Sequence, residues 1–373
     1  MAASVTRLWS RAGTDHGIFR RMSFRARHVV GFCASVLVGT LACARASAPL
    51  PPAEEVVLVV NKGAATLQVI PVDAPGSSTT IPLGGTSPTP TGVSALNGRA
   101  LVPLGADNSV AVVDLQSRQV TRVIPLAPNS GATGSAIVDD STGYVANPNL
   151  NTVTQVNYLT GDTASVAVGI YPQAVAFTRG KVFVLNGNLV NGQVAGPSWI
   201  SVVDPITNRL AGGTDSIPLP GPGNAIAGAV GPDGLLYVMN MGPDTGVEGR
   251  LSEVDPVGFD ELANFGGFGF GPGAIATNGI NQLYVSSLTE GLMVFDITRQ
   301  RVTRGAGNGL AIPHNSGVAV DSRQQVYALD AGDCASTPGT VHILRTDLSE
   351  IRTITTGLCA VAALVTEVPP NSP

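Results

Sequence analysis

The stretch GVAVDSRQQVYALD, residues 317–330, contains two short apolar segments joined by a polar turn. The first segment consists of Gly, Val and Ala, and the second has Tyr327 at its centre and ends on Asp330. Apolar runs of this length, bounded by turn-forming polar residues, are typical of paired β-strands. The same two segments recur along most of the chain, and this recurrence predicts the fold.

The second segment occurs seven times. Its copies share an aromatic or branched apolar centre, and most end on a polar residue: Val59–Asn61, Val102–Leu104 (the most divergent copy), Tyr144–Asn147, Phe183–Asn186, Tyr237–Asn240, Tyr284–Ser287 and Tyr327–Asp330. Their last residues are 43, 43, 39, 54, 47 and 43 positions apart. A period of about 40–50 residues is typical of the blades of a β-propeller.

Each unit continues with two further strands before the next small-residue strand begins. The third strand usually ends in Asp, as in Val112–Asp114, Val202–Asp204, Glu253–Asp255 and Val294–Asp296. The fourth reads Ile-Pro-Leu in three copies, at Ile81–Leu83, Ile124–Leu126 and Ile217–Leu219. Because proline cannot donate to a strand ladder, we expect the fourth strand at the outer edge of each blade. Strands of Gly, Ala and Ser fit the crowded centre of a ring, so we expect them innermost.

The predicted fold is therefore all-β, a seven-bladed β-propeller with four-stranded antiparallel blades. The first unit lacks an inner strand beside Val56–Asn61, whereas Ala360–Glu367 is a surplus inner strand at the C-terminal end. We expect these two strands to pair, because closing the ring removes two sheet edges that invite aggregation. The composition agrees, with 45 Gly, 27 Pro and only 13% charged residues. No helical-period segment separates the strands, which excludes parallel βαβ repeats.

The N-terminal segment has the features of an export signal. Six Arg residues and one acid, Asp15, fall within residues 1–43, and an uncharged apolar run extends from Val29 to Ala42. This run is too short to span a bilayer comfortably but fits a signal-peptide core, whether translation starts at Met1 or Met22. Gly39–Cys43 resembles a bacterial lipobox, in which the cysteine becomes lipidated; cleavage at Ala44–Ala46 is the alternative.

These features predict the domain boundaries. We expect a signal peptide of lipoprotein type over 1–43, a Pro-rich tether over 44–54, the propeller over 55–367 and a C-terminal tail over 368–373. The predicted location is the periplasm, the outer membrane or the cell surface. Cys334 and Cys359 are the two cysteines of the propeller, and in an oxidising compartment such a pair predicts a disulfide.

Charge limits the partners of this protein. Beyond residue 43 the chain has 21 − 6 = 15 basic and 26 − 1 = 25 acidic residues, and no basic stripe. Nucleic-acid affinity depends on neutralising phosphates, so this composition argues against a nucleic-acid partner. A membrane contact is expected only through the lipid anchor, and the molecule is expected to be a monomer.

The repeat resembles the YVTN-type repeat of bacterial seven-bladed propellers over roughly residues 55–367. The resemblance is carried by the strand Tyr-Val-x-Asn, the Asp-ending strand and the small-residue strand, and residues 313–321 have an NHL-like character. It implies the propeller fold and a place in the bacterial envelope. It implies little about activity, because propellers support binding and catalysis alike.

Candidate binding residues gather on one predicted face. Propeller topology brings the loops after the second strands together with the segments that join the blades, and long loops on a rigid scaffold are common ligand sites. The candidates are His314, Asn147, Asn186, Asn240, Asp330 and Asp333. Oxygen ligands of this kind suit Ca²⁺ or another divalent cation. The alternative is structural, because Asn and Asp at strand ends often cap turns, and His314 can bond to backbone.

Two functions are compatible with this pattern. The first is a non-enzymatic binding module that presents its loop-rich face to an envelope protein, a peptide or a small molecule, with no cofactor. The alternative is a metal-dependent enzyme of the lactonase or lyase type, with a cation near His314 and Asp330. The small-residue inner strands place few charged groups in the channel, which favours binding over catalysis.

Overall fold

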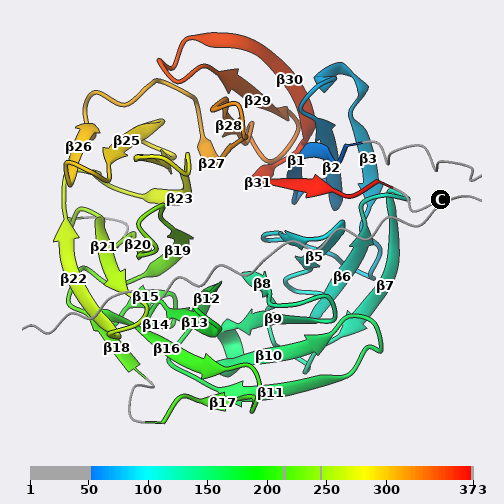
Figure 1. Cartoon of the computed structure of the whole chain (residues 1–373), viewed down its shortest axis with the longest axis vertical. Coiled ribbons are helices and arrows are strands. Elements are labelled where there is room, and N and C mark those ends of the chain that lie inside the picture. The colour runs from blue at the N-terminus through cyan, green and yellow to red at the C-terminus, as the bar shows by residue number, and fades with distance from the viewer. Residues whose placement is uncertain (1–51, 213–215, 244–245, 371–373) are drawn as a thin grey trace, which may run out of the picture. The chain divides into compact units, whose positions relative to one another are not determined.

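A computed structural model describes residues 52–212, 216–243 and 246–370. These residues form seven antiparallel sheets arranged as the blades of a ring (Figure 1). The predicted all-β seven-bladed propeller is therefore confirmed. No helix within these ranges is long and apolar enough to cross a bilayer.

The first three blades follow one pattern, in which successive strands run from the centre of the ring outward. Blade 1 contains β31 (Ala360–Val368), β1 (Glu54–Asn61), β2 (Thr66–Pro71) and β3 (Thr79–Pro82). Blade 2 contains β4 (Ser94–Leu96), β5 (Arg99–Pro103), β6 (Ser109–Asp114) and β7 (Gln119–Pro125). Blade 3 contains β8 (Ser135–Ile137), β9 (Thr142–Asn147), β10 (Thr152–Asn157) and β11 (Thr163–Ala167).

The other blades repeat this order. Blade 4 contains β12 (Pro172–Thr178), β13 (Lys181–Asn186) and β16 (Ser198–Asp204), with an outer edge split into β17 (Arg209–Leu210) and β18 (Ser216–Leu219). Blade 5 contains β19 (Ala225–Val230), β20 (Leu236–Asn240), β21 (Arg250–Asp255) and β22 (Asp260–Phe265). Blade 6 contains β23 (Pro272–Thr277), β24 (Gln282–Ser287), β25 (Met293–Asp296) and β26 (Arg301–Arg304). Blade 7 contains β27 (Asn315–Val320), β28 (Val326–Asp330), β29 (Pro338–Leu344) and β30 (Glu350–Leu358).

Three short elements lie outside the blades. They are a hairpin of β14 (Leu189–Val190) and β15 (Gln193–Val194), and two 3₁₀ turns, η1 (Pro75–Ser77) and η2 (Pro148–Leu150). The second strands of all blades run in the same direction, so they end on one face of the ring, here called the loop-rich face. The face where they begin is called the opposite face.

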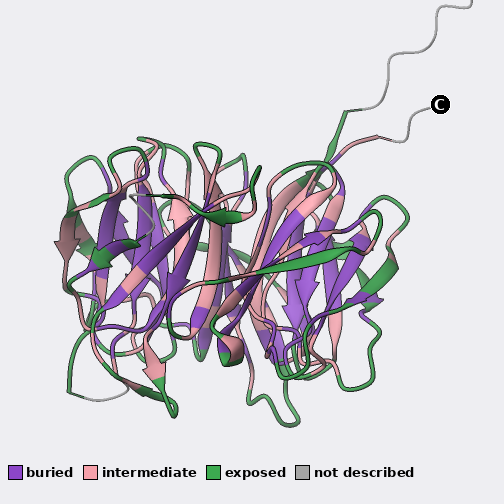
Figure 2. Ribbon diagram, turned by 90° about the horizontal axis from the view of Figure 1, so that it is seen from below, coloured by how far each residue is buried: buried purple, intermediate pink, exposed green. Residues whose placement is uncertain are grey.

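The ring is closed as the sequence predicts. β1 pairs antiparallel with β2 on one side and with β31 on the other, in a register that runs from Glu54↔Val368 to Asn61↔Ala360. Glu54 and Val368 therefore lie side by side on the opposite face, where both described ends of the chain leave the propeller (Figure 2). The Ile-Pro-Leu segments lie at the outer edges of their blades, as predicted. Pro82, Pro125 and Pro218 belong to the outermost strands β3, β7 and β18.

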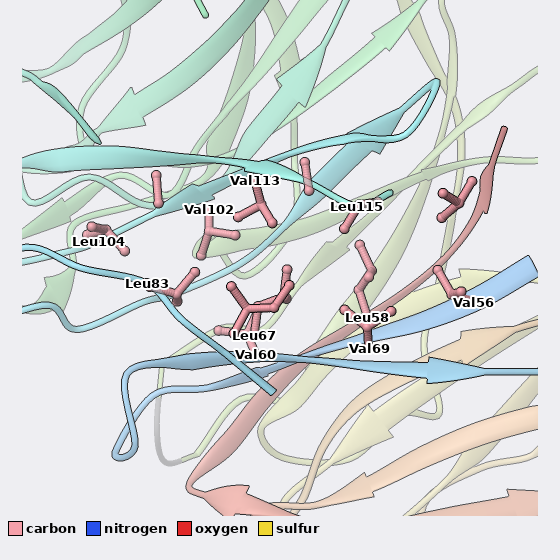
Figure 3. Packing of buried hydrophobic residues seen from close by; sticks show 14 residues of the cluster. Val56, Leu58, Val60, Leu67, Val69, Leu83, Val102, Leu104, Val113 and Leu115 are labelled. Carbon is pink, nitrogen blue, oxygen red and sulfur yellow. The ribbon is translucent and has the colours of Figure 1, made fainter. Parts of the chain in front are cut away.

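The core lies between neighbouring blades. Val56, Leu58 and Val60 of β1 project toward blade 2, where they pack with Val102 and Val113 (Figure 3). Alternate residues of β1, Val57 and Val59, pack against blade 7. β1 therefore has apolar residues on both sides and is buried between two neighbouring blades. Burial of this apolar area stabilises the ring at about 25 cal/mol per Å².

The repeated tyrosines anchor the second strands from within. Tyr144, Tyr237, Tyr284 and Tyr327 are fully buried. Their hydroxyls donate to side chains near the opposite face, namely Asn208, Asp233, Gln282 and Asp321. Burial of these phenols raises the pKa of Tyr144 and of Tyr284 to about 12. The tyrosine at the centre of the repeat is therefore a structural residue.

The disulfide predicted from the sequence is present between Cys334 and Cys359. Cys334 lies in the loop between β28 and β29 of blade 7, and Cys359 lies directly before the closing strand β31. The cross-link therefore ties blade 7 to the strand that completes blade 1, and it closes a segment with a sequence separation of 25 residues.

Removing this cross-link should weaken the closed ring. We expect the Cys334→Ser/Cys359→Ser variant to lose about 3 kcal/mol of unfolding free energy, because a loop of this length becomes free in the unfolded chain. Denaturant unfolding measures the loss. Reductant should destabilise the wild type and leave the double variant unchanged; equal stability of the two oxidised proteins would contradict the assigned role.

Candidate functional site

The loop-rich face is held together by backbone hydrogen bonds between two kinds of loop. A loop after a second strand donates to the segment that enters the same blade in blades 4, 5 and 7, and to the segment that enters the next blade in blade 6. The donors and acceptors are Asn188 N to Ile170 O (3.0 Å), Gly242 N to Gly223 O (3.0 Å), Leu292 N to Leu310 O (2.9 Å) and Ala331 N to His314 O (3.1 Å). This face therefore has a fixed backbone framework on which side chains can be presented.

The three strand-end asparagines of the candidate site are buried supports of this framework. Asn147 donates to Thr154 Oγ1 (2.7 Å), and Asn186 donates to Ser201 Oγ (3.0 Å). Asn240 makes the equivalent bond to Ser252 Oγ (2.9 Å). All three side chains are at most 1% exposed. Each side-chain amide is thus bound to the third strand of its own blade, as expected of a structural cap.

Segments that cross between blades lie close to strand-end asparagines, although Oδ1 of Asn147, Asn186 and Asn240 has no hydrogen-bond partner among the described residues. In blade 1, Asn61 Oδ1 accepts a hydrogen bond from Gly357 N (3.1 Å) of the crossing segment. In blade 4 the crossing segment carries Gly169, and a Cβ atom there would collide with Asn186 and Trp199. Glycine at this position lets the crossing chain lie directly on the asparagine.

This structural role can be tested at Asn186. We expect Asn186→Ala to lower the free energy of unfolding by about 1–3 kcal/mol, because Ser201 and the Trp199 carbonyl lose a buried partner. Thermal and denaturant unfolding measure the change, with Gln193→Ala on the exposed β15 as the control. An Asn186→Ala protein as stable as the control would show that this amide is free for another role.

Asp333 is also committed to local structure. Its carboxylate accepts hydrogen bonds from the backbone N–H groups of Ala335, Ser336 and Thr337, and from the hydroxyls of Ser336 and Thr337. The bond from Thr337 N and its neighbours hold the pKa of Asp333 well below its usual range. The residue caps the disulfide loop, and its oxygens are already occupied.

His314 and Asp330 are the two predicted candidates that the structure brings together. His314 Nδ1 lies 3.6 Å from Asp330 Oδ1, and the histidine side chain is 61% exposed. Asp330 Oδ1 also accepts from Gly332 N (2.8 Å), and His314 has a left-handed backbone with φ of 43°. The pair leaves one imidazole edge open to solvent on the loop-rich face, directly before the inner strand β27.

Asn315, which the sequence pattern did not single out, joins this pair. It is directly opposite Asp330 in the sheet, is 1% exposed, and neither side-chain amide atom has a hydrogen-bond partner. The equivalent position in other blades holds an apolar residue: Pro172, Ala225, Pro272 or Ala360. Burying an amide without a partner costs free energy, so blade 7 departs from the repeat here against its own stability. Aligning the seven repeats around their inner strands would have revealed the substitution.

The centre of the ring holds a neutral channel. A cavity of about 350 Å³ is lined by all seven inner segments, and none of its lining residues is charged. Its polar groups have partners: Ser316 Oγ donates to Ala360 O (2.6 Å), and Gln173 Nε2 donates to Asn224 Oδ1 (2.7 Å). The neutral channel predicted from the small-residue strands is therefore observed.

A second cavity, the blade 6–7 pocket, opens on the loop-rich face beside His314. It has a volume of about 440 Å³ and is lined by residues 288–291, 307, 309 and 311–313. Glu290 is the charged residue of this lining, while Leu288, Ile312 and Pro313 supply apolar walls. The pocket was not predicted, because its two walls are about 20 residues apart in the chain.

Exposed apolar side chains follow the same face across blades 4 to 6. This set, called the apolar arc, comprises Ile170, Val190, Val247, Phe270 and Leu288. Gly249 N donates to Gly269 O (2.8 Å), and Thr289 Oγ1 donates to Phe270 O (2.7 Å), so the loops of blades 5 and 6 are in contact. Three phenylalanines lie in or next to the glycine-rich segment 266–271. Phe265 and Phe268 pack into the core, whereas Phe270 is 42% exposed.

Side chains that could ligate a metal ion are dispersed over the described part of the chain. Within residues 52–212, 216–243 and 246–370, no group of three or more His, Cys, Asp or Glu side chains is placed to hold a metal ion. His314 and Asp330 supply two such groups, while the strand-end asparagines donate through Nδ2 and are buried within their own blades. Cys43 lies outside the described residues.

One of the comparisons with known proteins, that with solved structures, supports the fold. No family model matches the chain, and no curated protein sequence matches it. Among solved structures, Hydrazine Synthase of Kuenenia stuttgartiensis is similar, with a TM-score of 0.60 and 14% identity over 77% of this chain and 97% of that chain. At this identity the likeness concerns the fold alone. The protein is a seven-bladed β-propeller, and the resemblance to the YVTN-type repeat has no support from a family model.

Proposed function

We propose that this protein is a non-enzymatic binding module of the bacterial envelope, of YVTN-type ancestry, that holds a partner protein on its loop-rich face. The apolar arc is the observation that carries the proposal, because exposed apolar side chains on rigid loops beside a pocket typically mark protein contacts. Leu288 is 61% exposed and Phe270 is 42% exposed. The Thr289 hydroxyl, next to Leu288, donates to the Phe270 carbonyl and joins the two loops, so little ordering cost accompanies binding.

The proposed lipid anchor at Cys43 is compatible with this use of the loop-rich face. β1 begins at Glu54 on the opposite face, so an anchor that precedes it in the chain would join the propeller on that side. An anchored propeller would therefore present its loop-rich face away from the membrane.

The anchor is tested by metabolic labelling with a palmitate analogue. We expect the wild type to be labelled, Cys43→Ser to lose the label, and Cys33→Ser to keep it, because only the cysteine at the cleavage site receives lipid. Labelling is read after immunoprecipitation. Unchanged labelling of Cys43→Ser would contradict the anchor at this residue.

The binding face is tested by site-specific photo-crosslinking in cells. A photoreactive amino acid at position 270 or 288 should give a discrete adduct with a partner protein, because these positions lie in the apolar arc. Positions 206 and 257 are the matched controls: Ile206 is 92% and Val257 66% exposed, and both lie in turns of the opposite face. Equal adducts from both faces, or none from positions 270 and 288, would contradict the proposal.

A further inference from the structure

We infer that the blade 6–7 pocket receives a lysine or arginine side chain of the partner. This inference rests on the proposed function, because it names the chemistry of the segment that would cover the apolar arc. Leu288 belongs both to the arc and to the pocket wall, so a bound segment can contact both at once.

The pocket is built on a fixed backbone. Its two walls pair through Leu292 N to Leu310 O (2.9 Å) and Leu310 N to Leu292 O (2.8 Å). Gly309 lies against the Glu290 carbonyl so closely that a Cβ atom would collide with it. The two chain segments are therefore in direct backbone contact, and the pocket exists before a ligand arrives.

Glu290 supplies the charge that a cation would meet. Its Oε2 accepts a hydrogen bond from Gly307 N (2.8 Å), which orients the carboxylate. Its Oε1 accepts no hydrogen bond from the described residues, and no Lys, Arg or His among them forms an ion pair with it. An oriented, partly buried carboxylate with a free oxygen suits a charge-assisted hydrogen bond.

The walls fit the rest of such a side chain. Leu288, Ile312 and Pro313 are apolar and can cover the methylene stem of lysine or arginine, whose charged end remains near water. Glu290 is the charged residue of the lining, and no Lys, Arg or His lines the pocket. This single negative charge opposes an anionic ligand and favours a cationic one.

A fluorescein-labelled heptapeptide, Ser-Leu-Leu-Lys-Leu-Leu-Ser, is the probe, and its twin carries Gln in place of Lys. We expect fluorescence anisotropy to show tighter binding of the Lys peptide to the wild type. Glu290→Gln should weaken that binding about tenfold and remove the preference over the Gln peptide. Glu261→Gln, on the outer strand β22, is the matched control and should bind as the wild type does.

Folding of the variants is checked by their melting temperatures. Equal affinity for the Lys and Gln peptides, or a Lys preference that survives in folded Glu290→Gln, would overturn the inference. Photo-crosslinking at position 270 does not depend on Glu290. Adducts there without a Lys preference would therefore retain the binding face and reject the cation pocket, whereas a Lys preference without adducts would reject the binding face as proposed.

Discussion

β1 is hydrogen-bonded to β2 on one side and to β31 on the other, so the two ends of the chain meet in a single blade. Without this pairing the ring would be an open array with two exposed strand edges. Closure also brings the last crossing segment over Asn61, where Gly357 N donates to the asparagine. The disulfide at Cys359 secures the segment that enters β31. The geometry of the loop-rich face depends on these contacts because each blade packs against its neighbours.

A repeated architecture provides its own internal comparison. The asparagines at the strand ends of blades 3, 4 and 5 make the same contact. Each is buried and donates a hydrogen bond to a hydroxyl of the third strand. Repetition of one contact around the ring indicates a structural requirement. Blade 7 has Asp330 in place of this asparagine, with His314 beside it and Asn315 buried without partners. His314, Asn315 and Asp330 depart from the repeat at the same place in blade 7. They are therefore better candidates for a specific role than the asparagines that recur in other blades.

The two faces of the propeller differ in kind. On the opposite face, aspartates such as Asp114 and Asp204 accept backbone N–H groups of tight turns, and their position recurs from blade to blade. On the loop-rich face the loops vary in length, and those of blade 6 line a pocket beside the exposed Phe270 and Leu288. The recurring turns therefore lie on the face where the second strands begin, and the loops of variable length lie on the face where these strands end.

The sequence by itself determined the architecture of this protein. Strand identity, blade number, the order from centre to edge, ring closure and the Cys334–Cys359 bond all follow from periodicity, proline chemistry and cysteine count, which are local or repeated signals. The tertiary structure decided which polar residues are free. Asn147, Asn186 and Asn240 are predicted ligands whose Nδ2 groups donate to neighbouring strands, and the predicted ligand Asp333 accepts hydrogen bonds within its own loop. The blade 6–7 pocket forms because folding brings residues 288–291 next to residues 307–313. No local sequence pattern encodes this contact between two distant segments.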